Sequence, residues 1–371
     1  MEKIDLDNLY SSENSYLVPK YIDSKTSKRI LDVWKSLGLN GHIFIFSSGT
    51  SNKSSIKTYA ISKSSILANA KAVNRFLDLK SEDNLLLSIS PYHIGGLSIL
   101  FRAKVSGAKV FPYLGRWNPE VLFNYCKSEG INYLSLVPTQ MYDLVKLNFS
   151  CPSSIKGVFV GGDFISKTLL KSAMDLKWPV ILTYGATELS SQIATSFARD
   201  VKDGFLKVLD IHKVYLKDEV SYISSPSLFS KEIILNQNDF IITDANEEFP
   251  LPDYVELISK NDAIYLKPLG RITDELKIKG RLLNFLNIKD YSYSLFAKLD
   301  ILYKADIQVA ESHRLGKEIL IILEKSESDK STTIINKISD QFDRLFIPKV
   351  ILVDKLELTT SGKIKKINLT D

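Results

Sequence analysis

The sequence has 371 residues, of which 44% are hydrophobic and 25% are charged. This composition excludes collagen-like, low-complexity and largely disordered proteins. At about 100 to 200 residues per domain, the length suggests two or three domains, and one large domain with a smaller one is the simplest division. A formal charge of +5 permits anionic ligands such as nucleotides but does not indicate a nucleic-acid-binding protein.

The two cysteines, Cys126 and Cys151, form neither a C-x-x-C motif nor a disulfide framework. They are interpreted as buried thiols of a reducing compartment, with no structural zinc site. Residues 1–16 are acidic and polar, whereas a signal peptide has a basic start and an apolar run. No segment approaches the roughly 20 apolar residues that span a bilayer. We therefore expect a soluble, cytoplasmic protein that does not insert into membranes.

From about residue 40 to residue 185, short apolar runs alternate with segments of helical periodicity. This alternation predicts a doubly wound α/β domain with a mainly parallel sheet. The predicted strands are 42–46, 85–89, 109–111, 131–136, 157–160 and 180–183. Four helices are predicted between these strands. The first is capped by Ser64 or Ser65, and the second has Asn118 as cap and Pro119 as first residue. The other two span 139–147 and 166–176.

Beyond about residue 205 the pattern changes to short strands without long helices between them. These strands, which predict a β-rich subdomain of the large domain, are 213–217, 220–223, 232–235 and 240–243. After Gly270 the chain is rich in lysine, and a strand pair around Gly316 precedes a helix at about 332–345. We predict a large domain at 1–270 and a small, mobile α+β domain at 271–371.

Three segments carry residues suited to phosphate chemistry. Residues 47–57, directly after a strand, hold hydroxyls, a glycine and two lysines that can replace the water around a phosphate chain. Residues 183–188 follow another strand, and the hydroxyl of Thr187 beside the carboxylate of Glu188 can hold a phosphate together with Mg²⁺. Residues 359–363 present Lys363 near the end of the chain. Each segment also has an alternative reading when taken singly. The first is typical of a Ser-rich loop, the second of a surface turn and the third of a basic tail.

Their order resembles that of the adenylate-forming superfamily, which contains acyl-CoA synthetases, luciferases and adenylation domains. Residues 47–57 are similar to its T-S-G-T-T-G-x-P-K-G loop, 184–188 to its Y-G-x-T-E and 359–363 to its P-x-T-x-S-G-K. Residues 240–244 resemble W-x-x-T-G-D, and residues 270–274 resemble the G-R-x-D-D hinge. The resemblance runs from about residue 40 to the end of the chain.

A narrower resemblance is to o-succinylbenzoate-CoA ligases of menaquinone synthesis, in a form shorter at the amino-terminal side. Residues 91–98 are similar to their P-L-F-H-x-G-G-L-S, residues 135–140 to S-L-V-P-T-Q and residues 160–162 to a G-G-A turn. The alternatives are a core histidine at His93 and an ordinary tight turn at Gly161–Gly162.

The resemblance implies ATP-dependent formation of an acyl-adenylate, followed by transfer of the acyl group to CoA. Glu188 would bind Mg²⁺, Thr187 would contact the α-phosphate, and Lys363 would bridge the acid carboxylate and that phosphate. The implied ATP- or AMP-binding residues are Ser47, Ser48, Gly49, Thr50, Ser51, Lys57, Gly161, Gly162, Tyr184, Gly185, Asp244 and Arg271. The implied acid-binding residues are His93, Gly95, Gly96, Ser98, Arg102 and Thr139. The implied hinge is Thr273 and Asp274, and an exposed helix arginine is the alternative for Arg102.

The chain departs from the family pattern at several points. Asn52 replaces a glycine in the phosphate loop, and the loop is two residues longer, so Lys53 is an alternative to Lys57. Asp163 stands where the family has a small residue, and Thr273 stands at the first hinge aspartate. Three functions stay open: the o-succinylbenzoate ligase, an enzyme with another acid or a carrier-protein acceptor, and a nucleotide-binding relative with reduced catalysis. The partners would be ATP, CoA and a small carboxylic acid, not nucleic acid, and the protein would be a monomer or homodimer.

Overall fold

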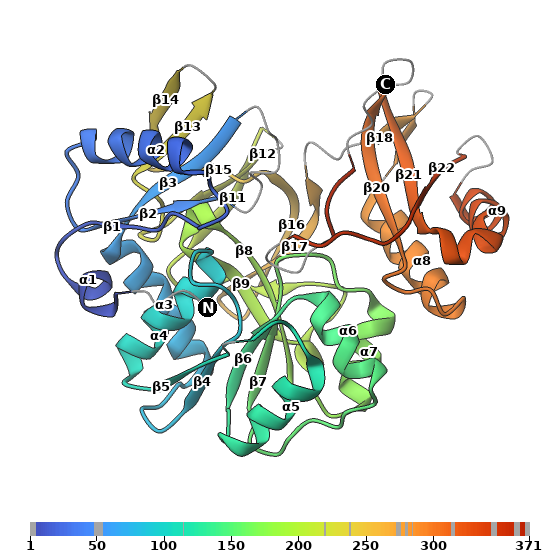
Figure 1. Cartoon of the computed structure of the whole chain (residues 1–371), viewed down its shortest axis with the longest axis horizontal. Coiled ribbons are helices and arrows are strands. Elements are labelled where there is room, and N and C mark those ends of the chain that lie inside the picture. Colours follow the sequence, from blue (N-terminus) through green and yellow to red (C-terminus); the bar gives the residue numbers. More distant parts are fainter. Residues whose placement is uncertain are drawn as a thin grey trace.

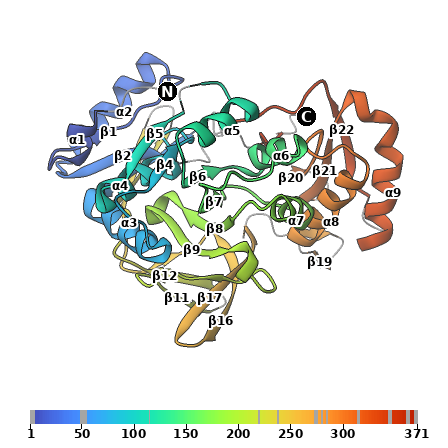
Figure 2. The same ribbon diagram turned by 90° about the horizontal axis from the view of Figure 1, so that it is seen from below.

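The computed structural model describes residues 5–47, 55–113, 115–218, 220–236, 239–271, 276–278, 281–283, 285–312, 316–342, 347–359 and 364–367. Its amino-terminal body holds two large sheets and two small ones, and the carboxyl-terminal elements form a separate sheet with helices beside it (Figures 1 and 2). In the described part of the chain, no helix is both long and apolar enough to cross a membrane.

A six-stranded sheet in the order β5-β4-β6-β7-β8-β9 forms the centre of the body. All its neighbouring strands are parallel except β8 and β9. The strands are β4 (Asn84–Leu87), β5 (Lys109–Pro112), β6 (Tyr133–Leu136), β7 (Gly157–Val160), β8 (Val180–Ala186) and β9 (Ser191–Phe197). One face packs on α3 (Lys63–Leu77) and α4 (Ile94–Ser106). The other packs on α5 (Pro119–Ser128), α6 (Pro138–Lys146) and α7 (Lys167–Asp175), which confirms the doubly wound prediction.

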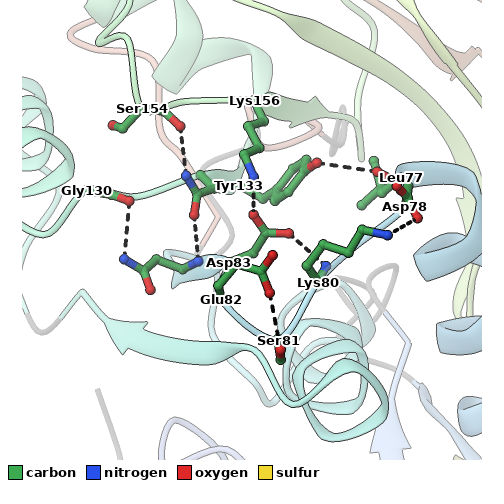
Figure 3. A network of polar contacts seen from close by, with 12 residues as sticks. Leu77, Asp78, Lys80, Ser81, Glu82, Asp83, Gly130, Tyr133, Ser154 and Lys156 are labelled. Atoms are coloured by element: carbon green, nitrogen blue, oxygen red, sulfur yellow. Dashed lines mark hydrogen bonds and ion pairs between the residues drawn. The ribbon is translucent and has the colours of Figure 1, made fainter.

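Polar contacts tie together the amino ends of these strands (Figure 3). The ammonium of Lys156 lies 2.6 Å from the buried carboxylate of Asp83, which also accepts a hydrogen bond from the backbone of Lys80. The Asn132 side chain accepts from the backbone N–H of Asn84 and donates to the carbonyl of Ser154. The amino ends of the strands are therefore held together by structural contacts, which leaves the carboxyl ends of the strands for ligands.

The second large sheet has the order β1-β2-β3-β13-β14. Its strands are β1 (Ser15–Tyr16), β2 (His42–Phe46), β3 (Ser55–Ser62), β13 (Lys231–Asn236) and β14 (Phe240–Asp244). Three predictions are corrected here. Residues 55–57 belong to a strand rather than to a phosphate loop, and α3 begins at Lys63 with Ser62 as its cap instead of Ser64 or Ser65. In addition, β13 and β14 extend the sheet of β2 and β3 instead of belonging to a β-rich subdomain, because β13 pairs with β3.

Two three-stranded sheets complete the body and share a core of aliphatic side chains. One contains β11 (Lys213–Lys217), β12 (Val220–Ser224) and β15 (Phe249–Pro250). The other contains β10 (Leu206–Lys207), β16 (Asp253–Lys260) and β17 (Ala263–Arg271). Two helices that the sequence analysis did not predict, α1 (Leu6–Tyr10) and α2 (Ser24–Ser36), precede β1 and β2. Both are anchored by aspartate caps, Asp5 and Asp23.

The carboxyl-terminal part combines a sheet with two helices, as predicted for an α+β unit. Its sheet has the order β20-β21-β22 and is built from β20 (Ala305–Ser312), β21 (Gly316–Glu324) and β22 (Lys349–Val353). Helices α8 (Phe285–Lys298) and α9 (Ser331–Phe342) cover it, and a short hairpin of β18 (Leu276–Ile278) and β19 (Arg281–Leu283) comes before α8. Helix α8 also lies beside α7 of the body. The domain boundary at residues 270 and 271 stays a prediction.

Candidate active site

The carboxyl ends of β6, β7 and β8 bring several predicted site residues to one edge of the central sheet. Gly161 and Gly162 follow β7, and the backbone N–H of Gly161 reaches the carbonyl of Leu136 at the end of β6. Tyr184 and Gly185 end β8, directly before a short 3₁₀ turn, η1 (Thr187–Leu189). In open α/β sheets this edge is where ligands bind.

Two positions at these strand ends require glycine, because neighbouring atoms come too close for a side chain. A Cβ atom at Gly161 would lie 2.1 Å from Oγ1 of Thr183, and one at Gly185 would lie 1.9 Å from the carbonyl oxygen of Ser191. Neither distance is compatible with a side chain, because the neighbouring strand would have to move. The glycine residues therefore bring the backbones of β7, β8 and β9 close together below the site.

The carboxylate of Glu188 projects from η1 toward β3. Its Oε1 accepts a hydrogen bond of 2.7 Å from the hydroxyl of Tyr59, which also lies 3.0 Å from Oε1 of Glu232 on β13. The ammonium of Lys57 lies 2.5 Å from the same oxygen of Glu232. Among the described residues, no lysine or arginine pairs with Glu188. In the described part of the chain, Lys57 therefore pairs with Glu232 and not with Glu188.

Glu188 has the chemistry of a magnesium ligand, although the described residues contain no group of three or more side chains that could enclose a metal ion. Mg²⁺ prefers carboxylate oxygens and is commonly held by one or two of them together with substrate phosphates. A half-buried carboxylate that pairs with no lysine or arginine of the described segments fits that mode of binding.

Lys57 is a predicted phosphate-binding residue that lies within the described part of the chain. It lies in β3, and its ammonium is engaged by Glu232. Of the loop residues, Ser47 is described, and its N–H donates to the carbonyl of Lys57, which extends the pairing of β2 with β3. The predicted site residues outside the described part of the chain are Ser48, Gly49, Thr50, Ser51, Thr273, Asp274 and Lys363, together with the alternative Lys53.

Asp244 does not lie with the other predicted nucleotide-binding residues. Cross-strand partners share a face, so Asp244 lies on the same face as its partners Lys231 and Ala60, with Lys231 forming an ion pair to it. Tyr59 and Glu232 are on the opposite face, which is the one toward Glu188. The side chain of Asp244 is therefore directed to the α2 side of the sheet.

A carboxylate that the sequence analysis missed contacts Tyr184 at the end of β8. Asp253 begins β16, and its Oδ2 accepts a hydrogen bond of 2.8 Å from the hydroxyl of Tyr184. Asp253 is also the register partner of Arg271, the predicted nucleotide-binding residue at the end of β17. The sequence held one signal for Asp253: it begins the first strand of the hairpin whose second strand ends in Gly270–Arg271.

The residues predicted to bind the acid gather around α4. His93 is the cap residue of this helix, and a Cβ at Gly96 would lie 2.3 Å from the carbonyl oxygen of Ser90. Ser98 is buried and accepts a hydrogen bond from Arg102. Gly95 supplies the carbonyl that accepts from the Ser98 hydroxyl, and Thr139 lies in the first turn of α6.

Arg102 is buried rather than an exposed helix arginine. Its side chain is 4% exposed, and its guanidinium lies 4.8 Å from the ring centroid of Phe159. No carboxylate of the described residues pairs with it, its Nε has no hydrogen-bond partner, and it lines a cavity of about 10 Å³. Burial lowers the pKa of Arg102 to about 10, so the group remains charged at neutral pH. A buried charge without a counter-ion is costly, and an anion would relieve that cost.

Comparison with known proteins agrees with a nucleotide site at this edge. Residues 41–219 match the family model described as AMP-binding enzyme. The matched segment is just under half of the chain. It includes the glycine turn after β7, the segment around Glu188, and the helix that carries Arg102.

Curated proteins that are similar to this chain are named 2-succinylbenzoate–CoA ligase. The protein from Staphylococcus aureus strain MSSA476 is 29% identical over 191 residues, which are 52% of this chain and 37% of the relative. The protein from Bacillus cytotoxicus is 31% identical over 153 residues, which are 41% of this chain and 31% of the relative. The matched segment therefore spans about a third of the length of these relatives.

Solved structures share the fold. The o-succinylbenzoate CoA synthetase MenE of Bacillus subtilis, in complex with OSB-AMP, has a TM-score of 0.73 at 19% identity, covering 97% of this chain and 78% of that one. ATP-bound MatB of Rhodopseudomonas palustris has a TM-score of 0.67 at 15% identity, covering 87% of this chain and 66% of that one. The predicted fold class, that of the adenylate-forming enzymes, is thereby confirmed.

Proposed function

We propose that the protein is an ATP-dependent acid-CoA ligase that converts o-succinylbenzoate to its CoA thioester through an acyl-adenylate. The observation that carries the proposal is the arrangement at the carboxyl ends of two neighbouring strands of the central sheet. The glycine turn at Gly161 follows β7, and Tyr184, which donates to Asp253, and Glu188 lie at the end of β8 and directly after it. The match to the AMP-binding enzyme model and the names of the curated relatives support it.

In the first step, a carboxylate oxygen of the acid attacks the α-phosphorus of ATP, and the bond to pyrophosphate breaks. In the second step, the CoA thiolate attacks the acyl carbonyl, and AMP leaves. Negative charge develops on oxygen in both steps, so positioned cations and N–H donors supply most of the stabilisation. Magnesium bound with the nucleotide neutralises phosphate charge, and Glu188 is its protein ligand in this proposal.

The binding of the nucleotide is assigned to residues at the sheet edge. Asp253, rather than Asp244, accepts hydrogen bonds from the ribose hydroxyls, because it lies next to Tyr184 and is paired in register with Arg271. Thr187 contacts the α-phosphate, and Gly161–Gly162 lets the nucleotide approach the backbone. Lys363 bridges the acid carboxylate and the α-phosphate from the small domain at 271–371, which closes over the site.

Arg102 is assigned to the second carboxylate of the acid. Its buried guanidinium has no carboxylate partner among the described residues, and a planar fork of N–H donors suits a carboxylate. This assignment favours an acid with two carboxylates, as o-succinylbenzoate has, over a monocarboxylic acid. It requires the α4 side of the sheet to open beyond the small cavity when the acid binds.

The proposal is tested by measuring pyrophosphate release with ATP, Mg²⁺ and o-succinylbenzoate, with and without CoA. We expect turnover that depends on the acid, increases with CoA and falls at least about 10²-fold in Lys363→Ala. Activity restricted to another acid or to a carrier-protein acceptor would replace the proposed substrate. Nucleotide binding without pyrophosphate release for any acid would favour a catalytically reduced relative.

A further inference from the structure

Tyr59 joins two carboxylates that share one cation among the described residues. Its side chain is fully buried in the middle of the second sheet. The hydroxyl oxygen lies 2.7 Å from Glu188 and 3.0 Å from Glu232, whereas the ammonium of Lys57 contacts Glu232 only.

The Tyr59 hydroxyl has one hydrogen and two carboxylates beside it, so the two contacts are not equivalent. A phenol has one hydrogen, and ionised carboxylates only accept, so Tyr59 cannot donate to both at once. Glu232 is already paired with the ammonium of Lys57, and the shorter contact of the Tyr59 hydroxyl is the one to Glu188. The hydroxyl of Tyr59 is therefore the donor in its contact with Glu188.

We propose that Tyr59 is a positioning residue for Glu188, orienting this carboxylate toward the magnesium ion that arrives with ATP. The proposal rests on the proposed function. Groups that hydrogen-bond to a metal ligand fix its direction, and their loss commonly weakens metal binding about 10- to 100-fold. The Tyr59 hydroxyl also contacts Glu232, which is paired with Lys57, and this second contact restricts the movement of the hydroxyl.

The backbone of Glu188 is held by the same group of residues. The N–H of Phe229 donates to the carbonyl oxygen of Glu188 over 2.9 Å. The ring of Phe229 packs against the ring of Tyr59, with centroids 5.1 Å apart. Removing the hydroxyl of Tyr59 would leave this ring contact in place, so Tyr59→Phe changes the hydrogen bond with little change in packing.

The test measures binding of Mn²⁺-ATP by isothermal titration calorimetry, which requires no acid and no turnover. We expect Tyr59→Phe to bind Mn²⁺-ATP about tenfold or more weakly than wild type, and to bind ATP in EDTA as tightly. Tyr293→Phe is the matched control, because the buried Tyr293 hydroxyl also donates to a carboxylate over 2.7 Å, but from helix α8 to Asp306 on β20. This control should bind Mn²⁺-ATP like wild type.

A double-mutant cycle separates positioning from a general loss of structure. In a Glu188→Gln background, Tyr59→Phe should weaken Mn²⁺-ATP binding by less than about twofold, because its target carboxylate is gone. Equal effects in both backgrounds, or wild-type affinity in folded Tyr59→Phe, would overturn the proposal and leave the proposed function intact. A wild-type protein that binds no Mn²⁺-ATP would instead overturn the proposed function, and the role of Tyr59 with it.

Discussion

The carboxylate of Asp163 lies 3.4 Å from the ammonium of Lys289 and so joins the turn after β7 to helix α8. The next residue, Phe164, packs edge-on against Tyr293 of the same helix, with ring centroids 5.7 Å apart. The turn proposed to contact the nucleotide is therefore also a docking point for the carboxyl-terminal part. Asp163 was noted in the sequence only as a departure from the small residue of the resembled family.

The aromatic contact should contribute more to this docking than the ion pair. An exposed ion pair contributes less than about 1 kcal/mol, whereas removing a half-buried phenylalanine ring costs about 2 kcal/mol. We predict that Phe164→Ala lowers the opening free energy of α8 more than Asp163→Ala does, as measured by native-state hydrogen exchange. High salt should weaken only the contribution of Asp163. A larger effect of Asp163→Ala would show that electrostatics dominates the contact.

The reassignment of the ribose carboxylate is tested with two isosteric variants. Asp253→Asn should weaken AMP binding about tenfold or more, because a hydrogen bond to a charged group contributes about 1.5 to 3 kcal/mol. Asp244→Asn should leave AMP binding unchanged, because that side chain lies on the opposite face of its sheet from Tyr59 and Glu232. Calorimetric titration with AMP measures both. The reverse pattern would restore Asp244 to the predicted role.

Arg102→Met should separate substrate recognition from stability. The guanidinium has no carboxylate partner among the described residues, so an apolar side chain of similar length should change the unfolding free energy by only about 1 kcal/mol. The KM for o-succinylbenzoate should rise about 10²-fold, while that for ATP stays constant. Denaturant unfolding and initial rates give the two quantities. An unchanged KM for the acid would place its second carboxylate elsewhere.

His212 should make the folded state less stable in acid. Its ring is buried between the hydroxyl of Ser225 and the carbonyl of Gln192, and burial lowers its pKa to about 4. An unfolded histidine has a pKa near 6.5, so the unfolded chain binds the proton more tightly. This contribution, about 3 kcal/mol, is complete above about pH 6.5 and is lost as the pH falls to 4. His212→Asn should flatten the urea stability profile in that window, and an equally steep profile would contradict the assignment.

Periodicity and capping in the sequence determined most elements of the central sheet. Strand β7 has the predicted bounds, and α5 begins as predicted, with the side chain of Asn118 accepting from the backbone N–H of Val121. These features depend on neighbouring residues along the chain, so they can be derived from the sequence. The motif around Glu188 was located in the same way, because its residues are contiguous.

The strand at 55–62 could not be recognised because serine and lysine occupy its start, and its pairing with β13 joins residues far apart in the sequence. The same reason explains why the sequence analysis named Asp244 and missed Asp253. Each aspartate is adjacent to a plausible motif, and which of them lies beside Tyr184 depends on how separate sheets pack. Burial of Arg102 and the contact between Tyr59 and Glu188 also arise from that packing. Sequence determined the local elements and the class of site, and tertiary structure decided which side chains meet, because those contacts join residues distant in the chain.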